Sequence, residues 1–275
     1  MSNLVKRVLF TVVALPTGIF LIFLGAWPYA IFISLILARA IWEYADLFGL
    51  PPSKPARWLM VASVLGILFV RFLFGTGHDH WVLALICAII VGYQLVQYER
   101  GNDKAGSGFA IMLSGVLYIG LMGSYMMLLR ETPVFGEWWL LLTVFAVILT
   151  DTMAYFLGTR FGRHRMTPRL SPKKSWEGFA AGAIFSALGT PLFGLLFHVF
   201  GMPRDPQFSL VNVFVLGLCV GVLSPLGDLG ISMIKREVHL KDTGDILPGH
   251  GGVLDRADSW LWAFPIGYYL ALIFQ

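Results

Sequence analysis

The chain has 275 residues, of which 57% are apolar and only 13% are charged, whereas an ordinary soluble domain carries about 25% charged residues. Its mean hydropathy is +0.75, and a soluble domain of this size could not bury so much apolar surface in one core. The composition therefore excludes a soluble enzyme, a disordered chain and a nucleic-acid-binding domain, and it indicates a polytopic membrane protein.

Apolar runs between charged or turn-rich breaks predict about nine transmembrane helices, because about 20 apolar residues cross the hydrocarbon layer. The runs lie at 8–26, 29–48, 58–75, 81–98, 109–129, 138–158, 179–200, 211–230 and 259–274. The expected fold class is an all-α, polytopic integral membrane helix bundle. Residues 1–130 would form about five spans, and residues 131–275 would form a catalytic region of about four spans with cytoplasmic loops.

The distribution of the 20 lysines and arginines predicts the orientation. With the N-terminus in the cytoplasm, Arg71, Arg130 and Arg204 fall outside and Arg39 falls within the second span. All the other basic residues then lie on the cytoplasmic side, as the positive-inside rule expects. Basic residues gather most densely in 159–178 and 231–258, so polar chemistry is concentrated on one face of the membrane.

Two polar segments near the C-terminus carry the most informative pattern. If the segment from Ser224 to Arg236 is helical, Asp228, Ser232 and Lys235 share one face. The segment from Lys241 to Gly252 is rich in glycine and can bring backbone amides close to an anion. Carboxylates, cationic side chains and glycine amides in one region predict a metal and phosphate site, since Mg²⁺ prefers oxygen ligands and leaves positions for substrate phosphates.

The run from Ser232 to Asp258 resembles the signature of phosphatidate cytidylyltransferases, also called CDP-diacylglycerol synthases. It reads SMIKR, four further residues, and then KDTGDILPGHGGVLDRAD. Asp151 to Gly162 and Ser171 to Gly178 are similar to a second motif region of that family. The motifs cover roughly residues 151–260, and the N-terminal half is similar only in its hydrophobic layout. Ile231 and Ala257 depart from the family pattern but leave the charged groups intact.

This resemblance implies that the protein joins CTP and phosphatidate to form CDP-diacylglycerol and pyrophosphate. It further implies dependence on magnesium, with a potassium ion as a candidate companion, and a homodimer. We expect an integral protein of a bacterial cytoplasmic membrane, in contact with membrane lipids, that binds no nucleic acid and faces the cytoplasm with its site.

The expected metal ligands are Asp228 and Asp255, with Asp151 or Asp258 as further candidates. Cationic side chains are expected to hold the phosphates of both substrates: Lys173, Lys174, Lys235, Arg236, Lys241 and Arg256. Hydroxyl groups could donate to phosphate or ligate a metal, and the glycine turn could line the pyrophosphate side: Ser175, Ser232, His250, Gly251 and Gly252.

Simpler structural interpretations remain open for several of these residues. Asp151 could be a solvated helix end, Lys173 and Lys174 could anchor the membrane topology, and His250 could serve only the turn. Asp228 and Asp255 could instead form ion pairs with Lys235 or Arg256. Arg39 and Glu43, one turn apart in the second span, are most simply an intramembrane pair, but they could also flank the polar site.

Two other functions remain as alternatives. A related CTP-dependent enzyme could act on a different lipid phosphate or a lipid alcohol. A secondary transporter could also contain broken helices with buried charges. A transporter predicts polar groups near the bilayer midplane and two corresponding halves, neither of which the sequence favours.

Overall fold

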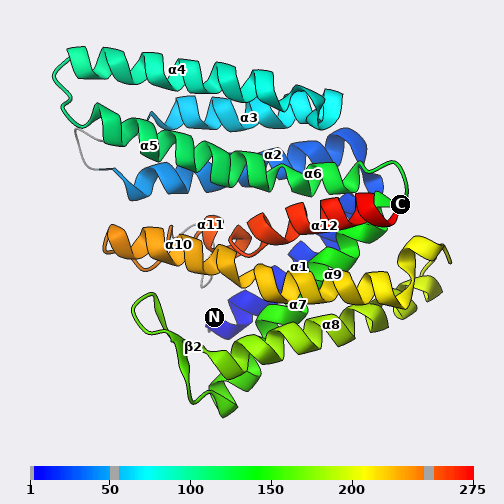
Figure 1. The fold of residues 1–275 in the computed structure, drawn as a ribbon. Coiled ribbons are helices and arrows are strands. Elements are labelled where there is room, and N and C mark those ends of the chain that lie inside the picture. Colours follow the sequence, from blue (N-terminus) through cyan, green and yellow to red (C-terminus); the bar gives the residue numbers. More distant parts are fainter. Residues whose placement is uncertain (1–2, 50–55, 245–250) are drawn as a thin grey trace. The chain divides into compact units, whose positions relative to one another are not determined.

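The computed structural model describes residues 3–49, 56–244 and 251–275, and within the first helix it describes the side chains of residue 12 and of residues from 14 onward. The described chain is predominantly helical (Figure 1), and it divides into two compact units. Unit 1 comprises Met1–Leu128 with Glu237–Ala257, and unit 2 comprises Leu129–Arg236 with Asp258–Gln275. The expected assignment of catalysis to residues 131–275 stays a prediction.

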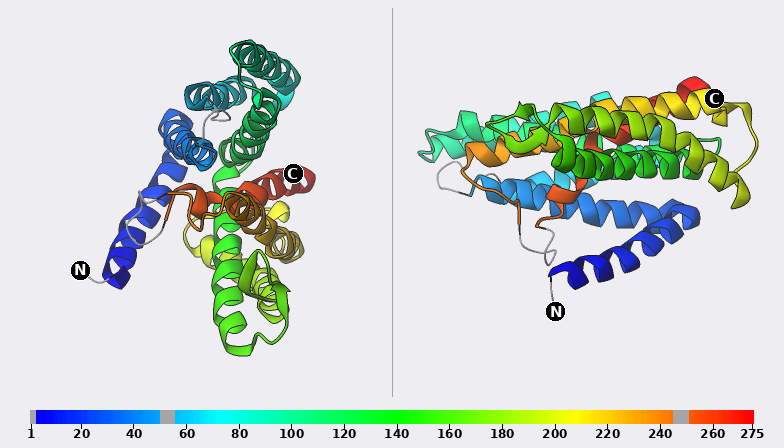
Figure 2. Two further views of the ribbon diagram at one scale, coloured as in Figure 1. Left: turned by 90° about the vertical axis from the view of Figure 1, so that its left-hand side faces the viewer. Right: turned by 90° about the horizontal axis from the view of Figure 1, so that it is seen from below.

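Unit 1 is built from the first helices of the chain and a later segment that packs on them. Its elements are α1 (Asn3–Leu24), α2 (Ala26–Leu47), α3 (Arg57–Phe74), η1 (Gly75–His78), α4 (Asp79–Glu99), α5 (Ala105–Gly115), η2 (Val116–Leu121), the start of α6 (Tyr125–Arg130) and α11 (Leu254–Ala257). Helix α2 packs on α3 and α11, and α4 packs on α3 and α5. The end-on view in Figure 2 shows α2, α3, α4 and α5 running side by side.

Unit 2 contains the remaining helices and a short hairpin. Its elements after the end of α6 are α7 (Gly136–Phe161), β1 (Arg165–Thr167), β2 (Ser171–Ser175), α8 (Trp176–Val199), η3 (Pro206–Phe208), α9 (Leu210–Leu223), α10 (Pro225–Glu237) and α12 (Trp260–Phe274). Helix α8 packs against both α7 and α9, and α12 packs against α7 and α9. Unit 2 therefore has α7, α8, α9 and α12 as its packed core.

Small residues set how closely α7, α8 and α9 approach. A Cβ atom added at Gly182 would lie 2.8 Å from the Thr150 carbonyl oxygen of α7, and one at Gly221 would lie 2.8 Å from the Ala183 Cα of α8. Neither position has room for a side chain. Both glycines belong to GxxxG pairs, at 178–182 and 217–221, and this spacing is typical of closely packed membrane helices.

Five helical segments are long and apolar enough to cross a membrane within the described ranges: Arg57–Glu99, Ala105–Arg130, Gly136–Phe161, Trp176–Val199 and Leu210–Glu237. Each run predicted as a span overlaps a helix or a chain of helices in the described residues. Large apolar side chains such as Leu188 and Leu192 of α8 face outward, as expected where lipid is the solvent. The all-α membrane class is supported, while the number of spans and the cytoplasmic N-terminus stay predictions.

The hairpin is an addition to the expected all-helical fold. Strands β1 and β2 are antiparallel, and Arg165 pairs with Ser175 and Thr167 with Ser171. Pro172 cannot donate to a ladder, but in a two-stranded hairpin each strand is an edge and tolerates it. The hairpin carries Lys173, Lys174 and Ser175, so a segment expected to be an irregular loop has a defined backbone.

Candidate functional site

The residues predicted for the site fall into two clusters, one in each unit. Unit 2 holds Asp151, Lys173, Lys174, Ser175, Asp228, Ser232, Lys235, Arg236 and Asp258. Unit 1 holds Lys241, Gly251, Gly252, Asp255 and Arg256. His250 lies outside the described residues.

Asp228 is the centre of the unit 2 cluster. It lies in the first turn of α10, and its Oδ1 accepts a hydrogen bond from Ser232 Oγ at 3.2 Å. Its Oδ2 lies 2.6 Å from Lys174 Nζ of strand β2. The helical spacing of Asp228 and Ser232 is thus confirmed, and Asp228 forms an ion pair with Lys174, a partner that the alternative of a pair with Lys235 or Arg256 did not include.

The hairpin contacts α10 at a second point. Arg236 Nε, near the C-terminal end of α10, donates to the Leu170 carbonyl oxygen in the hairpin turn at 3.3 Å. The two contacts lie at opposite ends of α10, since Asp228 belongs to its first turn and Arg236 to its last turn. The residues of both motif regions in unit 2 are therefore held together by an ion pair and a hydrogen bond.

Asp258 is a buried carboxylate that faces the same cluster. Burial, followed by repulsion from Asp228 and then from Asp151, raises the pKa of Asp258 well above its ordinary value, although the Ser259 amide and Lys235 act in the opposite direction. The Ser259 amide donates to Asp258 Oδ1 at 2.7 Å. Asp258 thus lies near two other carboxylates, Asp228 and Asp151, and a bound cation would stabilise its ionised form.

Unit 2 holds carboxylate oxygens, the kind of donor that Mg²⁺ prefers. No group of three or more His, Cys, Asp or Glu side chains lies close enough to enclose an ion anywhere in the described ranges. Mg²⁺, however, is usually bound by one or two protein carboxylates and completes its shell with water and substrate phosphates. Asp228 lies near enough to Asp258 to raise its pKa, and Lys174 and Ser232 orient the Asp228 carboxylate.

Ser175 has an observed structural role. It is the N-cap of α8, where its Oγ accepts from the Gly178 amide at 3.2 Å, and it is buried. A serine directly before a helical run is a cap signal in the sequence. Its predicted contact with substrate stays a prediction, as does that of the exposed Lys173.

Asp255 organises the glycine-rich segment of unit 1. Its Oδ2 accepts from the Thr243 amide at 2.8 Å, from Thr243 Oγ1 at 3.1 Å and from the Gly252 amide at 3.0 Å. Gly251 beside it has a positive φ of 80°, a conformation that glycine adopts readily. The backbone of the signature is thus folded around this carboxylate, while Lys241 and Arg256 are exposed.

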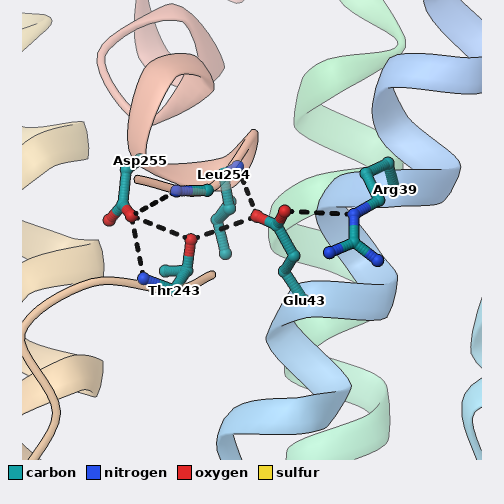
Figure 3. Close-up of polar contacts among 6 residues, drawn as sticks. Arg39, Glu43, Thr243, Leu254 and Asp255 are labelled. Carbon is teal, nitrogen blue, oxygen red and sulfur yellow. Dashed lines mark hydrogen bonds and ion pairs between the residues drawn. The ribbon is translucent and has the colours of Figure 1, made fainter. Parts of the chain in front are cut away.

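Glu43 contacts this segment from helix α2 (Figure 3). The predicted pair with Arg39 is confirmed, with Nε 3.1 Å from Glu43 Oε1. The Glu43 side chain also accepts from Thr243 Oγ1 and from the Leu254 amide. An ionisable residue at predicted membrane depth was the only sequence signal for this role, and it did not indicate which residues Glu43 would contact.

Apolar helices that carry clusters of charged side chains are typical of a helical membrane protein with polar functional sites. The sequence profile described as the cytidylyltransferase family matches residues 5–274, so the chain belongs to that family. It is 27% identical to a phosphatidate cytidylyltransferase of Bacillus subtilis, over the full length of both chains. It is 31% identical to one of Brucella abortus, covering 100% of this chain and 95% of the relative.

A third relative, a phosphatidate cytidylyltransferase of Synechocystis, is 30% identical over 98% of this chain and 96% of its own length. These matches extend through the N-terminal helices. The alignments therefore reach beyond the motif regions at 151–260, and residues such as Glu43 lie inside the aligned region.

Proposed function

We propose that this protein converts CTP and phosphatidate to CDP-diacylglycerol and pyrophosphate. An oxygen of the lipid phosphate attacks the α-phosphorus of CTP and forms a new P–O–P linkage. The bond from the α-phosphorus to the oxygen that bridges to the β-phosphate breaks, and pyrophosphate leaves. The contact between Lys174 and Asp228 carries the proposal, because it joins the two motif regions, and the relatives' names support it.

The chemistry requires alignment more than deprotonation. A phosphomonoester has a second pKa near 6, so the lipid phosphate is mostly ionised at neutral pH. The obstacle is the repulsion between two polyanions, which fixed cations and positioning must overcome. Lys174, Lys235 and Arg236 supply fixed positive charge in unit 2, where they would hold phosphates.

Asp228 and Asp258 would hold Mg²⁺, with Asp151 as a further candidate and a potassium ion as a candidate companion. When bound, the magnesium ion would neutralise phosphate charge and help to orient the triphosphate. Ser232 and Lys174 keep the Asp228 carboxylate in one orientation. The assignment of Asp255 as a ligand rests on the signature motif, and the described contacts of Asp255 support its role in shaping the loop.

The site would face the cytoplasm of a bacterial cell from its cytoplasmic membrane. CTP is a cytosolic solute, and phosphatidate presents its phosphate at the headgroup level of the membrane. Nine spans with a cytoplasmic N-terminus place 159–178 and 231–258 on that side by the positive-inside rule. Cysteine variants at Arg163 and at Arg204 test this topology, since a membrane-impermeant thiol reagent added to sealed right-side-out vesicles should label only the second. Cys87 and Cys219 should first be replaced with alanine.

The activity test uses the purified full-length protein with CTP, Mg²⁺ and phosphatidate in mixed micelles. Mass spectrometry should find CDP-diacylglycerol together with one pyrophosphate per lipid product. A parallel reaction with an isoprenoid alcohol or its phosphate separates this activity from that of a related lipid cytidylyltransferase. Product formation only with the isoprenoid acceptor, or cytidine label only in water-soluble products, would contradict the proposal.

A further inference from the structure

Glu43 is an acidic side chain deep inside unit 1, only 1% exposed. Burial of a carboxylate is unfavourable unless hydrogen bonds and opposite charge compensate for lost water. Its position in helix α2 is remote in sequence from the signature, by 200 residues from Thr243 and 211 from Leu254. The retention of a charged group here therefore requires an explanation beyond the packing of α2.

The two carboxylate oxygens of Glu43 have different partners. Oε1 lies 3.1 Å from Arg39 Nε, one turn earlier in the same helix. Oε2 accepts from the Leu254 amide at 2.9 Å and lies 3.1 Å from Thr243 Oγ1, whose single hydrogen it shares with Asp255 Oδ2. One oxygen thus faces Arg39 of α2. The other contacts Thr243 and Leu254, which lie before and after the glycine-rich turn of the signature segment (Figure 3).

The glycines of the segment are fitted to this carboxylate. A Cβ atom at Gly252 would collide with Glu43 Oε2 and with Thr243 Oγ1, and one at Gly244 would lie 3.2 Å from Glu43 Oε1. Their lack of side chains lets the backbone pass beside Glu43. The position of Glu43 therefore explains on steric grounds why residues 244 and 252 are glycines. A role in phosphate binding would not explain it.

Thr243 connects Glu43 to Asp255. Its Oγ1 lies 3.1 Å from Glu43 Oε2 and 3.1 Å from Asp255 Oδ2, so a single hydroxyl lies between two carboxylates. The Thr243 amide also donates to Asp255 at 2.8 Å. Displacement of Thr243 would therefore change the orientation of the Asp255 carboxylate.

We infer that Glu43 is a positioning residue for the reaction: it fixes Thr243 and Leu254, so that Asp255 keeps the orientation in which it would bind Mg²⁺, the role that the signature motif gives it. The inference rests on the proposed function and deepens it. It assigns a part in catalysis to helix α2, in line with the alternative that Arg39 and Glu43 flank the polar site. Glu43 acts through Thr243, in the way that outer residues orient the ligands of a metal site.

The test compares Glu43→Gln with Asp46→Asn in the full-length protein. Asp46 lies on the same helix and pairs with Arg57 at 2.8 Å, so its amide variant removes an acidic charge and an ion pair without touching the signature. Removal of an outer partner typically costs 10–100-fold in metal affinity or activity. We expect Glu43→Gln to lower kcat about 10–100-fold and to raise the Mg²⁺ concentration for half-maximal rate, with Asp46→Asn within about twofold of wild type.

A binding measurement without turnover separates positioning from general stability. Mg²⁺ titrated into the purified protein should raise the wild-type Tm, and the half-point of that rise should move to higher Mg²⁺ in Glu43→Gln. Thr243→Val removes the hydroxyl between the carboxylates and should give the same shift. The double variant should add little to either single variant, since both act through one contact.

Two results would overturn the inference. One is a wild-type Mg²⁺ requirement and kcat in folded Glu43→Gln and Thr243→Val. The other is loss only of yield or Tm with an unchanged Mg²⁺ half-point, which would assign a purely structural role. If Glu43→Gln cannot be purified, Thr243→Val decides alone. An inactive wild type would refute the proposed function, while the Mg²⁺-dependent Tm shift would still decide on Glu43.

Discussion

Lys174 Nζ and Asp228 Oδ2 are 2.6 Å apart, which links a strand residue of the hairpin to the first turn of α10. The two residues are 54 positions apart in the sequence and are both half-buried. An ion pair between exposed groups contributes little, but this one also fixes the orientation of a carboxylate whose other oxygen accepts from Ser232. The pair therefore contributes to the arrangement of the site more than to the stability of the fold.

Lys174→Met should lower kcat/KM for CTP about 10–100-fold, because Asp228 loses an orienting partner and phosphate loses a cation. Arg169→Met is the matched control, since it removes one positive charge from the same hairpin at an exposed position. Steady-state kinetics on both variants give the comparison. Equal effects of the two substitutions would mean that only the overall charge of the hairpin matters.

Asp228→Asn should reduce kcat by at least about 100-fold, because the amide keeps the size of the side chain but removes the charge proposed to bind Mg²⁺. Ser232→Ala should cost less, about tenfold, since it removes one hydrogen bond to that carboxylate. The thermal unfolding midpoint should stay close to wild type in both. A fully active Asp228→Asn would contradict the assignment of this residue as a ligand.

Helical periodicity was sufficient to predict the unit 2 site in part. The i, i+4 spacing of Asp228 and Ser232 predicted their shared face, because helix geometry alone determines that neighbour. The GxxxG spacings at 178–182 and 217–221 likewise indicate close crossings, because small residues let helices approach. The hairpin did not follow from the sequence, because its strands are short, one of them contains Pro172, and neither has the alternation of a half-buried strand.

Contacts between distant segments could not be predicted from spacing. Glu43 was recognisable as an unusual charge within an apolar run, and its neighbour Arg39 as a partner on the same helix. Its bonds to Thr243 and Leu254 depend on how α2 packs with the signature segment, which no local pattern encodes. The same holds for Lys174, whose partner could not be distinguished from several nearby acidic residues.

The raised pKa of Asp258 predicts a pH dependence of stability in metal-free buffer. A carboxyl group whose pKa is higher in the folded state binds its proton more tightly there, so its contribution to the free energy of unfolding is largest below the unfolded value of about 3.9. That contribution falls as pH rises toward the folded value, by up to about 1.4 kcal/mol per pH unit. Asp258→Asn removes this loss because an amide does not ionise.

Thermal unfolding of wild type and Asp258→Asn in EDTA from pH 4 to pH 8 measures the effect. The Tm of the variant should exceed that of wild type increasingly as pH rises, while its cytidylyltransferase activity in Mg²⁺ should fall. Adding Mg²⁺ should reduce the difference in Tm, since a bound cation stabilises the ionised carboxylate. Parallel Tm curves across the whole range would show that Asp258 is not destabilised by its neighbours.

Gly221→Ala should destabilise the crossing of α8 and α9 and lower activity with it. The added methyl group would lie 2.8 Å from the Ala183 Cα, where backbone must move, and overpacking of this kind typically costs about 1–3 kcal/mol. Gly92→Ala in α4 is the control, because no atom lies within 4 Å of its added Cβ and alanine favours a helix by up to about 1 kcal/mol.

Helix α9 ends at Leu223 and α10 begins at Pro225, so a displaced α9 would also move Asp228. We therefore expect Gly221→Ala to lower both Tm and kcat, with Gly92→Ala unchanged or slightly more stable. Thermal unfolding and initial rates on the two variants decide the matter. A drop in Tm at normal kcat would show that Lys174 and Arg236 hold α10 in place independently of the α8–α9 crossing. A drop in both Tm and kcat would support a rigid connection from that crossing through α10 to the Asp228 carboxylate.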